Sequence, residues 1–446
     1  RDNHITCPWN ELDRKHVRLV DTGQNRSLPL QPPGNQCPLP ATQGVTICGA
    51  LKREMRHIWR GAASPPLLFF LDRTRNHFMS LLTRCNPPTI GETSPHARLR
   101  SAAVRNVGSM NEIVANYESY VDYCFAHPQE GRHRRRLNNV QLLYQSLYEI
   151  FSNPLMLGSA YKHCFEHGGR AAGADQLKYE DYPKPALLHA SHLLKDLSSE
   201  IRAGSFDIGQ MKPVKINKPG KSEKRKLFLA NIETRWVERA IVQTIRPLFE
   251  REFLEYSMGG RPNRCPRMAL EYAQTIMRAR EYGVWLVFDV RRAFDNIPRS
   301  QLFEVMRKRL HDSAICDLIE RLVEVKGIRR GIRQGSSISP LLMNLYADHF
   351  FDKWWQQQHP DVPMVRYIDD IAIFCRSETE AVALYGESKS KLLAVGLPIK
   401  ESLDEALCML SDGKTANWLG VQCSMSDHGL QFRLTEKAWS SLAEGV

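Results

Sequence analysis

The fold is decided by the stretch Val365-Arg366-Tyr367-Ile368-Asp369-Asp370-Ile371-Ala372-Ile373-Phe374, in which two adjacent aspartates stand inside an apolar run. Val365, Tyr367, Ile371 and Ile373 share one parity along the chain, and Ile368, Ala372 and Phe374 share the other. This pattern predicts a β-hairpin buried on at least one face, with Asp369 and Asp370 at its tip. Burial of two unpaired anions side by side is very costly. The two carboxylates therefore require a compensating charge, and a divalent metal ion is the obvious one.

A second apolar run also ends in a carboxylate. The chain reads Val284-Trp285-Leu286-Val287-Phe288-Asp289-Val290 and continues as Arg291-Arg292-Ala293-Phe294-Asp295. Carboxylates at the ends of adjacent buried strands can hold two hard cations about 3.5–4 Å apart, which is the geometry for in-line phosphoryl transfer. One pair of aspartates is equally compatible with a solvated turn, whereas the two runs together favour metal binding.

Four segments along the chain form a set: Asp289 to Asp295, Arg333-Gln334-Gly335-Ser336-Ser337-Ile338-Ser339-Pro340-Leu341-Leu342, Tyr367-Ile368-Asp369-Asp370 and Trp418-Leu419-Gly420. In this order they resemble the first and second palm motifs, the Tyr-x-Asp-Asp box and the primer-grip turn of reverse transcriptases of the bacterial retron and group II intron type. The resemblance covers roughly residues 140 to 440. It implies an α+β fold with fingers and a right-hand polymerase palm, in which helices pack on an antiparallel sheet.

The resemblance also implies an activity, RNA-directed DNA polymerase, which makes cDNA by two-metal-ion nucleotidyl transfer. Asp289, Asp369 and Asp370 would be the catalytic metal ligands, and the Val290 carbonyl would be a further ligand. The cofactor would be two Mg²⁺ ions, with Mn²⁺ as an alternative. The partners would be an RNA template, a DNA or RNA primer and dNTPs, and a dedicated structured RNA is a further candidate.

Substrate contacts follow from the same resemblance. A hairpin crowded with seven cations, from Lys212 to Leu227, resembles the fingers hairpin, and its Lys218 and Arg225 match the residues that contact the triphosphate. Arginine suits a bidentate phosphate contact and lysine acts as a point charge. Phe294 matches the aromatic residue that blocks a ribose 2′-hydroxyl, although a core role is the alternative.

The second palm motif supplies the remaining substrate contacts. Gln334 and Gly335 would line the pocket of the nascent base pair. The family usually has proline where this chain has Arg333, so we expect the turn before Gln334 to differ. Asp295 is expected to be a structural cap or ion-pair partner rather than a metal ligand.

Four residues are predicted to contact the nucleic acid. Arg261 and Arg264 lie in a loop that resembles the family's Gly-x-Arg-Pro loop along the template, with structural ion pairs as the alternative. Trp418 and Gly420 belong to the primer-grip turn. Lys400 lies in the region where the family places a catalytic-acid lysine, but its spacing is shorter than usual.

Composition agrees with a nucleic-acid partner. The formal net charge is +12, which favours an anionic ligand, and 42% of the residues are hydrophobic, which supports globular cores. Eleven cysteines without a CxxC pair argue against a zinc site or a disulfide framework and favour the cytoplasm. No apolar run reaches 18 residues, so the sequence predicts no membrane span.

The expected organisation has four parts. Residues 1–105 form a poorly ordered N-terminal segment of unknown function, 106–288 a helical extension and the fingers, 289–415 the palm, and 416–446 the primer-grip region and the start of a thumb. The thumb is expected to be largely missing. Because the chain begins with Arg1 and most of the thumb is missing, both ends are expected to lack residues of the natural protein.

Two other functions share much of this pattern. An intron-type RNA-binding maturase, acting as a splicing cofactor, would need no intact acidic set, and an RNA-dependent RNA polymerase would favour a small or polar residue at the position of Phe294. Ser339-Pro340 is typical of retron and group II-like enzymes, and the absence of Asn-Ala-x-x-His argues against a standard retron enzyme. Intron mobility, antiviral defence and a host-domesticated role are all compatible with the sequence.

Overall fold

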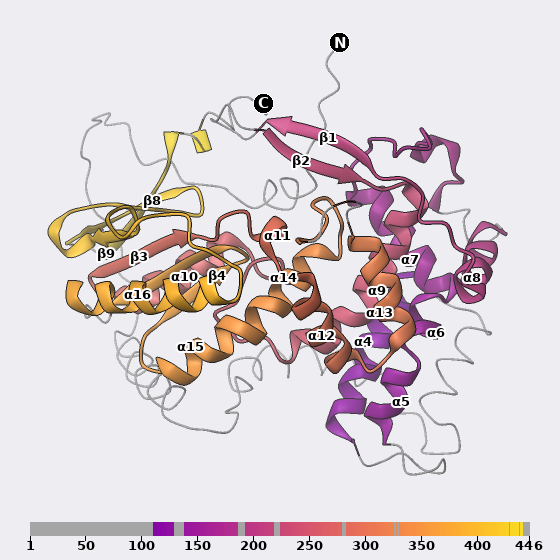
Figure 1. The fold of residues 1–446 in the computed structure, drawn as a ribbon, viewed down its shortest axis with the longest axis horizontal. Coiled ribbons are helices and arrows are strands. Elements are labelled where there is room, and N and C mark those ends of the chain that lie inside the picture. Colours follow the sequence, from indigo (N-terminus) through magenta and orange to yellow (C-terminus); the bar gives the residue numbers. More distant parts are fainter. Residues whose placement is uncertain are drawn as a thin grey trace, which may run out of the picture.

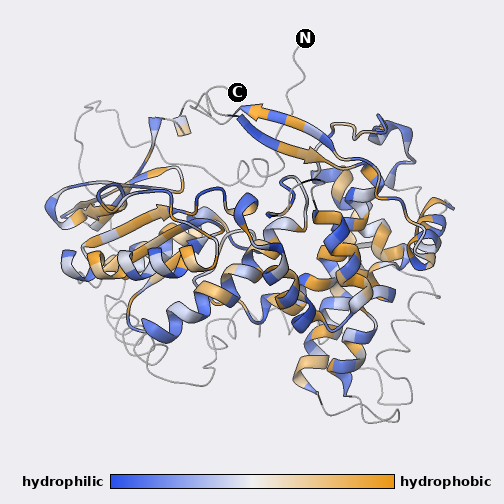
Figure 2. Cartoon of the chain, in the orientation of Figure 1, coloured by the Kyte–Doolittle hydropathy of each residue, from blue (hydrophilic) through white to orange (hydrophobic). Residues whose placement is uncertain are grey.

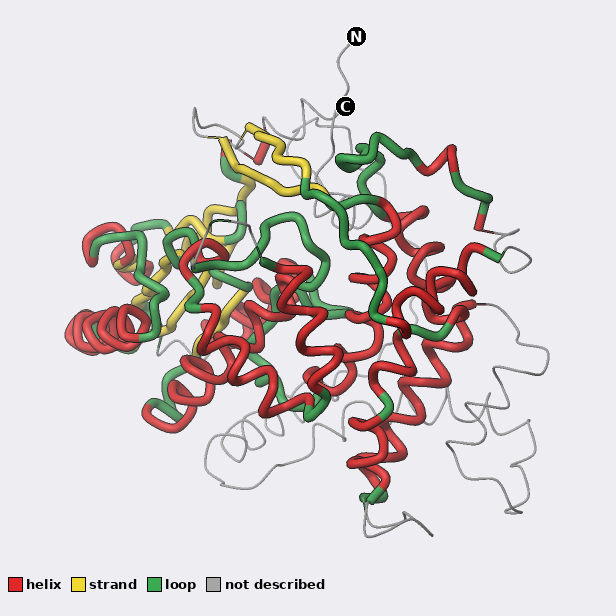
Figure 3. Tube along the Cα trace, turned by 45° about the vertical axis from the view of Figure 1, so that its right-hand side comes forward, coloured by secondary structure: helices red, strands yellow, loops and turns green. Residues whose placement is uncertain are grey.

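The computed structural model describes residues 110–128, 138–185, 192–217, 224–278, 282–324, 327, 330–427, 429–436 and 438–439. The predicted N-terminal segment 1–105 lies outside them, and so does Lys218. In Figure 1 the helical part lies on the right, in indigo and magenta, and two sheets lie on the left. Figure 3 shows the same separation, with strands in yellow gathered beside helices in red. No helix within these ranges is long and apolar enough to cross a membrane.

The helical part is built around one central helix. Its described helices are α4 (Met110–Ala126), α5 (Asn139–Gln145), α6 (Leu147–Phe151), α7 (Pro154–His167), α8 (Leu193–Ala203) and α9 (Ile232–Glu250), with a 3-10 turn, η1 (Tyr179–Asp181). Local signals set their ends: Asn153 caps α7 by accepting the Leu155 N–H, and Pro154 occupies the first turn. The apolar face of α9, which includes Trp236 and Ala240, is buried against α7 and α4.

The predicted basic hairpin follows α8 in the chain. Strand β1 (Lys212–Asn217) pairs with β2 (Lys224–Leu229) in antiparallel register, which places Ile216 opposite Arg225. The two strands lie at the top of the molecule in Figure 1.

The central sheet has four antiparallel strands in the order β4-β5-β3-β6: β3 (Val284–Asp289), β4 (Met364–Tyr367), β5 (Asp370–Cys375) and β6 (Leu407–Met409). Because side chains alternate along a strand, Trp285 and Leu286 point to opposite faces. Helix α10 (Pro266–Met277) covers the face of Trp285, and α16 (Glu378–Ala394) covers the other. Burial on both faces explains why the strands are almost continuously apolar, as Figure 2 shows in orange.

A smaller sheet packs on the α10 side. It consists of β7 (Ala416–Trp418), β8 (Val421–Ser426) and β9 (Gly429–Leu434) in that order. Leu419 and Gly420 form the turn between β7 and β8, with φ values of 51° and 81°. Positive φ at both central residues is the signature of a type I′ hairpin turn, which matches the twist of the strands.

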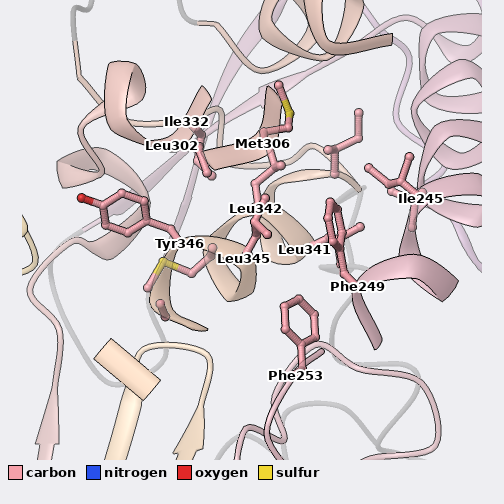
Figure 4. Packing of buried hydrophobic residues seen from close by; sticks show 14 of the residues in the cluster. Ile245, Phe249, Phe253, Leu302, Met306, Ile332, Leu341, Leu342, Leu345 and Tyr346 are labelled. Atoms are coloured by element: carbon pink, nitrogen blue, oxygen red, sulfur yellow. The ribbon is translucent and has the colours of Figure 1, made fainter. Parts of the chain in front are cut away.

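The remaining helices join the two halves: α11 (Ala293–Asn296), α12 (Arg299–Leu310), α13 (Ser313–Val323), α14 (Ser339–Ala347), the π-helical turn η3 (Asp348–Asp352), α15 (Lys353–Gln358), α17 (Leu403–Ala406) and the 3-10 turn η4 (Leu410–Asp412). Helix α14 is buried along its whole length. Figure 4 shows its Leu342 between side chains of α12, such as Met306, and side chains of α9, such as Phe249. One core therefore connects the helical part to the central sheet.

Candidate active site

The three predicted catalytic carboxylates meet at one end of the central sheet. Asp289 is the last residue of β3 and lies opposite Asp370, the first residue of β5. The Val290 N–H donates to the Asp369 carbonyl at 3.0 Å, which extends the pairing beyond the strands. Asp369 lies in the turn after β4, next to Ile368, whose φ of 62° is left-handed. The structure therefore has the predicted hairpin, with the aspartates at its tip.

The three carboxylates are half-buried and crowded. Burial, together with the charges of Asp289 and Asp369, raises the pKa of Asp370 to about 8. Burial and the charge of Asp369 raise the pKa of Asp289 to about 7. Burial also raises the pKa of Asp369, and the nearby Arg225 guanidinium opposes part of that shift. The site therefore holds more negative charge than its surroundings compensate.

Two residues from a later segment complete the site. The Lys400 ammonium lies 3.6 Å from Asp289 Oδ2 and contacts the Glu401 carboxylate. Glu401 Oε2 accepts a hydrogen bond of 2.7 Å from the Asp289 N–H, and the Lys400 N–H donates to the Asp289 carbonyl at 2.9 Å. The sequence reasoning noted the region of Lys400 but missed Glu401, because this contact joins residues 112 positions apart.

The donor set fits a hard divalent cation. Carboxylate oxygens are the ligands that Mg²⁺ prefers, and burial and mutual repulsion raise the pKa values of Asp289 and Asp370 even with the Lys400 ammonium nearby, so a further positive charge would stabilise the ionised carboxylates. As the side chains lie, no three acidic, histidine or cysteine side chains in the part of the chain that the structure describes are close enough together to hold one ion. The strands that carry the aspartates are already paired. Rotation of the aspartate side chains about their own torsions is therefore the change that would bring their carboxylates around an ion.

The raised pKa values predict that the metal-free protein becomes less stable as the pH rises from about 4 to about 8. Asp289 and Asp370 bind protons more tightly in the folded protein than in the unfolded chain, so their deprotonation favours unfolding. We expect the urea midpoint to be lower at pH 8 than at pH 5.5, and Mg²⁺ to raise it more at pH 8. The double variant Asp289→Asn plus Asp370→Asn should lose most of both effects. The same pH dependence in that variant would assign it to other groups.

A buried arginine supports the turn that carries Asp369. Arg366 is 1% exposed and donates to both carboxylate oxygens of Asp352 in η3, at 2.8 and 2.5 Å. The same guanidinium donates to the Ile368 carbonyl at 2.9 Å and to Asn344 Oδ1 at 2.8 Å. The left-handed residue of the turn is therefore held by a cation whose own charge is compensated. The sequence reasoning missed this role, although a lone cation inside the apolar run of β4 is a visible signal.

The predicted base-pocket residues lie beside the basic hairpin. The Phe228 N–H in β2 donates to the Gln334 carbonyl at 2.9 Å, and the Gln334 side chain donates to Asp295 Oδ1 at 3.0 Å. Gly335 has a φ of 105°, and a Cβ at this position would lie 3.1 Å from the Phe228 carbonyl oxygen. Arg225 is exposed on the same strand. The structure thus joins the loop of Gln334 and Gly335 to strand β2, which also carries Arg225.

Phe294 is half-buried in α11, and its ring packs against the main core. Its carbonyl accepts a hydrogen bond of 2.7 Å from the Ile332 N–H, which fixes α11 to the segment that leads into the base-pocket loop. The ring therefore contributes to the core, while part of it stays exposed.

Comparison with known protein families explains why these residues occur together. The model of the family described as reverse transcriptase (RNA-dependent DNA polymerase) matches residues 216–423, which include all three aspartates, the base-pocket loop and the turn at Gly420. This part of the chain is a reverse transcriptase domain. Reverse transcriptases as a family use divalent metal ions and bind RNA templates. The use of metal ions agrees with the carboxylate oxygens that meet at this site.

Curated relatives of the reverse transcriptase domain include intron proteins. The COX1/OXI3 intron 2 protein of Saccharomyces cerevisiae is 25% identical over 232 residues, which cover 50% of this chain and 26% of that protein. The group II intron-encoded protein LtrA of Lactococcus lactis subsp. cremoris is 22% identical over 271 residues, which cover 57% of this chain and 44% of LtrA. The chain therefore spans less than half the length of either protein. These relatives confirm the resemblance to the group II intron type.

A solved structure of apo telomerase from Candida tropicalis, truncated from its C-terminal domain, also aligns with the chain. The TM-score is 0.36 and the sequence identity 12%, over 51% of this chain and 55% of that chain.

Two predicted nucleic-acid contacts of the reverse transcriptase domain are interior residues. Arg261 is 7% exposed, and its guanidinium donates to Glu250 Oε2 at 2.7 Å and to three backbone carbonyls. It therefore has the structural role that was the alternative. Trp418 is 2% exposed and packs edge-on against Trp285. Neither side chain is accessible to a nucleic acid, so the prediction of direct contact is corrected for both.

The other two predicted contacts lie at the surface of the domain. Arg264 forms an ion pair of 2.6 Å with the Glu255 carboxylate, so its charge is already compensated. Gly420 is exposed in the turn between β7 and β8. Gly420 is thus the accessible part of the predicted primer grip, and Trp418 anchors the turn from inside.

Proposed function

We propose that this chain is an RNA-directed DNA polymerase that extends a DNA or RNA primer with dNTPs on an RNA template. The observation that carries the proposal is the meeting of Asp289, Asp369 and Asp370 at one end of the central sheet of a reverse transcriptase domain. Nucleotidyl transfer builds negative charge on phosphoryl oxygens, and a site for this reaction must hold compensating cations. The uncompensated acidic edge of this sheet is suited to that task.

The proposed cofactors are two Mg²⁺ ions, with Mn²⁺ as an alternative. Asp289, Asp369 and Asp370 would hold them, together with the carbonyl of Val290. When bound, the ions would activate the primer 3′-hydroxyl and neutralise charge on the α-phosphate and the leaving pyrophosphate. The identity and the number of the ions are both part of this proposal.

The chain's own side chains would bind and orient the nucleotide. Arg225, exposed on β2 and near Asp369, would bind the triphosphate together with Lys218. Gln334 and the backbone of Gly335 would contact the new base pair, since a residue without a Cβ permits close approach. Phe294 would stand against the sugar and exclude a 2′-hydroxyl group.

The proposed organisation follows the predicted parts with one change. The helical extension and fingers begin at 106, and the primer grip and the start of the thumb occupy 416–446. The predicted boundary at 289 falls at the end of β3 and separates this strand from its own sheet. We therefore begin the palm with α10. A cytoplasmic location remains our proposal, from the eleven cysteines without a CxxC pair.

Primer extension by the full chain on an RNA template with Mg²⁺, comparing dNTPs with rNTPs, tests the function. We expect DNA products that disappear in the double variant Asp369→Ala plus Asp370→Ala. Ribonucleotide products would instead assign an RNA-dependent RNA polymerase. Folded wild-type protein that binds RNA but makes no product would contradict the proposal. An assay of intron splicing would then test the maturase alternative.

A further inference from the structure

A second buried ion pair joins α9 to the loop before α14. Arg333, at the position where the family usually has proline, is 0% exposed and pairs with the Glu238 carboxylate of α9, which is 1% exposed. Burial, reinforced by the charge of Arg235, lowers the pKa of Arg333 only to about 9, so the guanidinium stays charged at neutral pH. A buried charge is tolerated only where partners satisfy it, so this arginine must be held by its surroundings.

The Arg333 guanidinium contacts three separate elements. Its Nε donates to the Leu322 carbonyl in α13 at 3.1 Å, and its Nη1 donates to the Phe228 carbonyl in β2 at 2.8 Å. Its Nη2 contacts Glu238 in α9. The Arg333 N–H also donates to the Val323 carbonyl at 2.9 Å. A proline at this position could make none of these contacts, because it lacks both the N–H and the side-chain donors.

Phe228 is the residue at which the hairpin and the loop meet. Its N–H donates to the Gln334 carbonyl, and its own carbonyl accepts from Arg333. Gly335 packs against the same carbonyl. Arg225 precedes Phe228 by three residues on one strand, so any slip of Phe228 along the loop would move Arg225 relative to Gln334.

We propose that Arg333 and Glu238 form a positioning pair that fixes the phosphate-binding strand β2 against the base-pocket loop and so sets the affinity for the incoming nucleotide. The proposal rests on the polymerase function proposed above. Neither side chain touches the reacting atoms, and both act through Phe228 and the loop. Glu238 also contacts the loop before α14 directly, since its Oε2 accepts a hydrogen bond from the Ser337 N–H at 3.3 Å.

The test compares Arg333→Met, Glu238→Met and the double variant. Removal of one partner leaves the other charge buried and unpaired, so each single variant should unfold at a lower denaturant concentration. Two apolar side chains of similar length should restore most of the unfolding midpoint in the double variant. In that folded variant we expect the KM for dNTPs to rise about tenfold, the size expected for loss of one hydrogen bond. The kcat should change by less than about threefold, since the reacting groups are untouched.

A second measurement does not depend on activity. Hydrogen exchange at the Phe228 amide should be about tenfold or more faster in the double variant than in the wild type, because the loop that accepts its N–H is no longer held. The buried amide of Ile241 in α9 should be unaffected.

Arg307→Met is the matched control, since Arg307 joins α12 to α13 through Asp317 and Glu320 without reaching the loop. Both the KM and the Phe228 exchange rate should stay at wild-type values in this control.

The outcomes separate this proposal from the function on which it rests. A wild-type protein that makes no product contradicts the polymerase function, while the exchange rate of Phe228 still reports whether the pair holds the loop. A folded double variant with unchanged KM overturns the positioning role. An unchanged exchange rate at Phe228 overturns it as well.

Discussion

Replacement of Asp289 with asparagine is expected to lower the rate of nucleotide incorporation about a thousandfold, which corresponds to a barrier rise of ~4 kcal/mol. Asparagine keeps the shape of the side chain at the end of β3, but it removes the charge that attracts a divalent cation. The fold should not suffer, because the variant removes one of three crowded anions whose mutual repulsion contributes to the raised pKa values of Asp289 and Asp370. Single-turnover primer extension on an RNA template measures the rate, and a urea titration checks the fold.

The matched control for this variant is Asp361→Asn. Asp361 is exposed in the loop before β4, away from the carboxylate edge. Its variant should incorporate nucleotides at the wild-type rate. A rate for Asp289→Asn close to that of the control would mean that the chemistry does not depend on the acidic end of the sheet.

Replacement of Arg366 with methionine is expected to destabilise the protein by about 3–5 kcal/mol, because loss of one partner leaves the other charge of a buried pair uncompensated. Asp352 would remain buried without its cation, and the Ile368 carbonyl would lose its donor. Domains of this kind are stable by only about 5–15 kcal/mol, so the folded fraction would be strongly reduced. Denaturant titration gives the free energy of unfolding, and the fraction soluble after expression gives an independent measure.

Arg376→Met provides the comparison for a surface arginine. Arg376 is 44% exposed and pairs with Glu380 within the first turn of α16. Ion pairs of this kind contribute roughly 0–1 kcal/mol. If Arg366→Met cost no more than Arg376→Met, the network under the catalytic turn would have no stabilising role.

Local patterns are sufficient for the elements that carry the site. The residues around Asp369 and Asp370 predict the hairpin because apolar side chains of both parities flank the pair, as they do in a buried strand. In α12 the buried residues Leu302, Val305 and Met306 likewise recur at helical spacing. In each case the signal lies within the element that it describes.

Contacts between distant segments leave no such signal. Glu401 reaches the backbone of Asp289 across 112 positions, and Arg333 reaches Phe228 across 105. A single sequence does not report which carbonyl will satisfy a cation once the chain is folded. For Trp418 a motif identifies the turn correctly, but only tertiary packing decides that the indole faces the interior.

The strand order of the central sheet has a consequence for how the chain is made. β3 lies between β5 and β6, and both of these strands come later in the chain. Asp370 follows its partner Asp289 by 81 positions (370 − 289). At translation rates of ~5–20 residues per second, β3 is synthesised about 4–16 s before the first strand that can pair with it. Throughout that interval its apolar side chains and unpaired backbone are open to other nascent chains. Self-association therefore competes with folding at the ribosome until β5 has emerged.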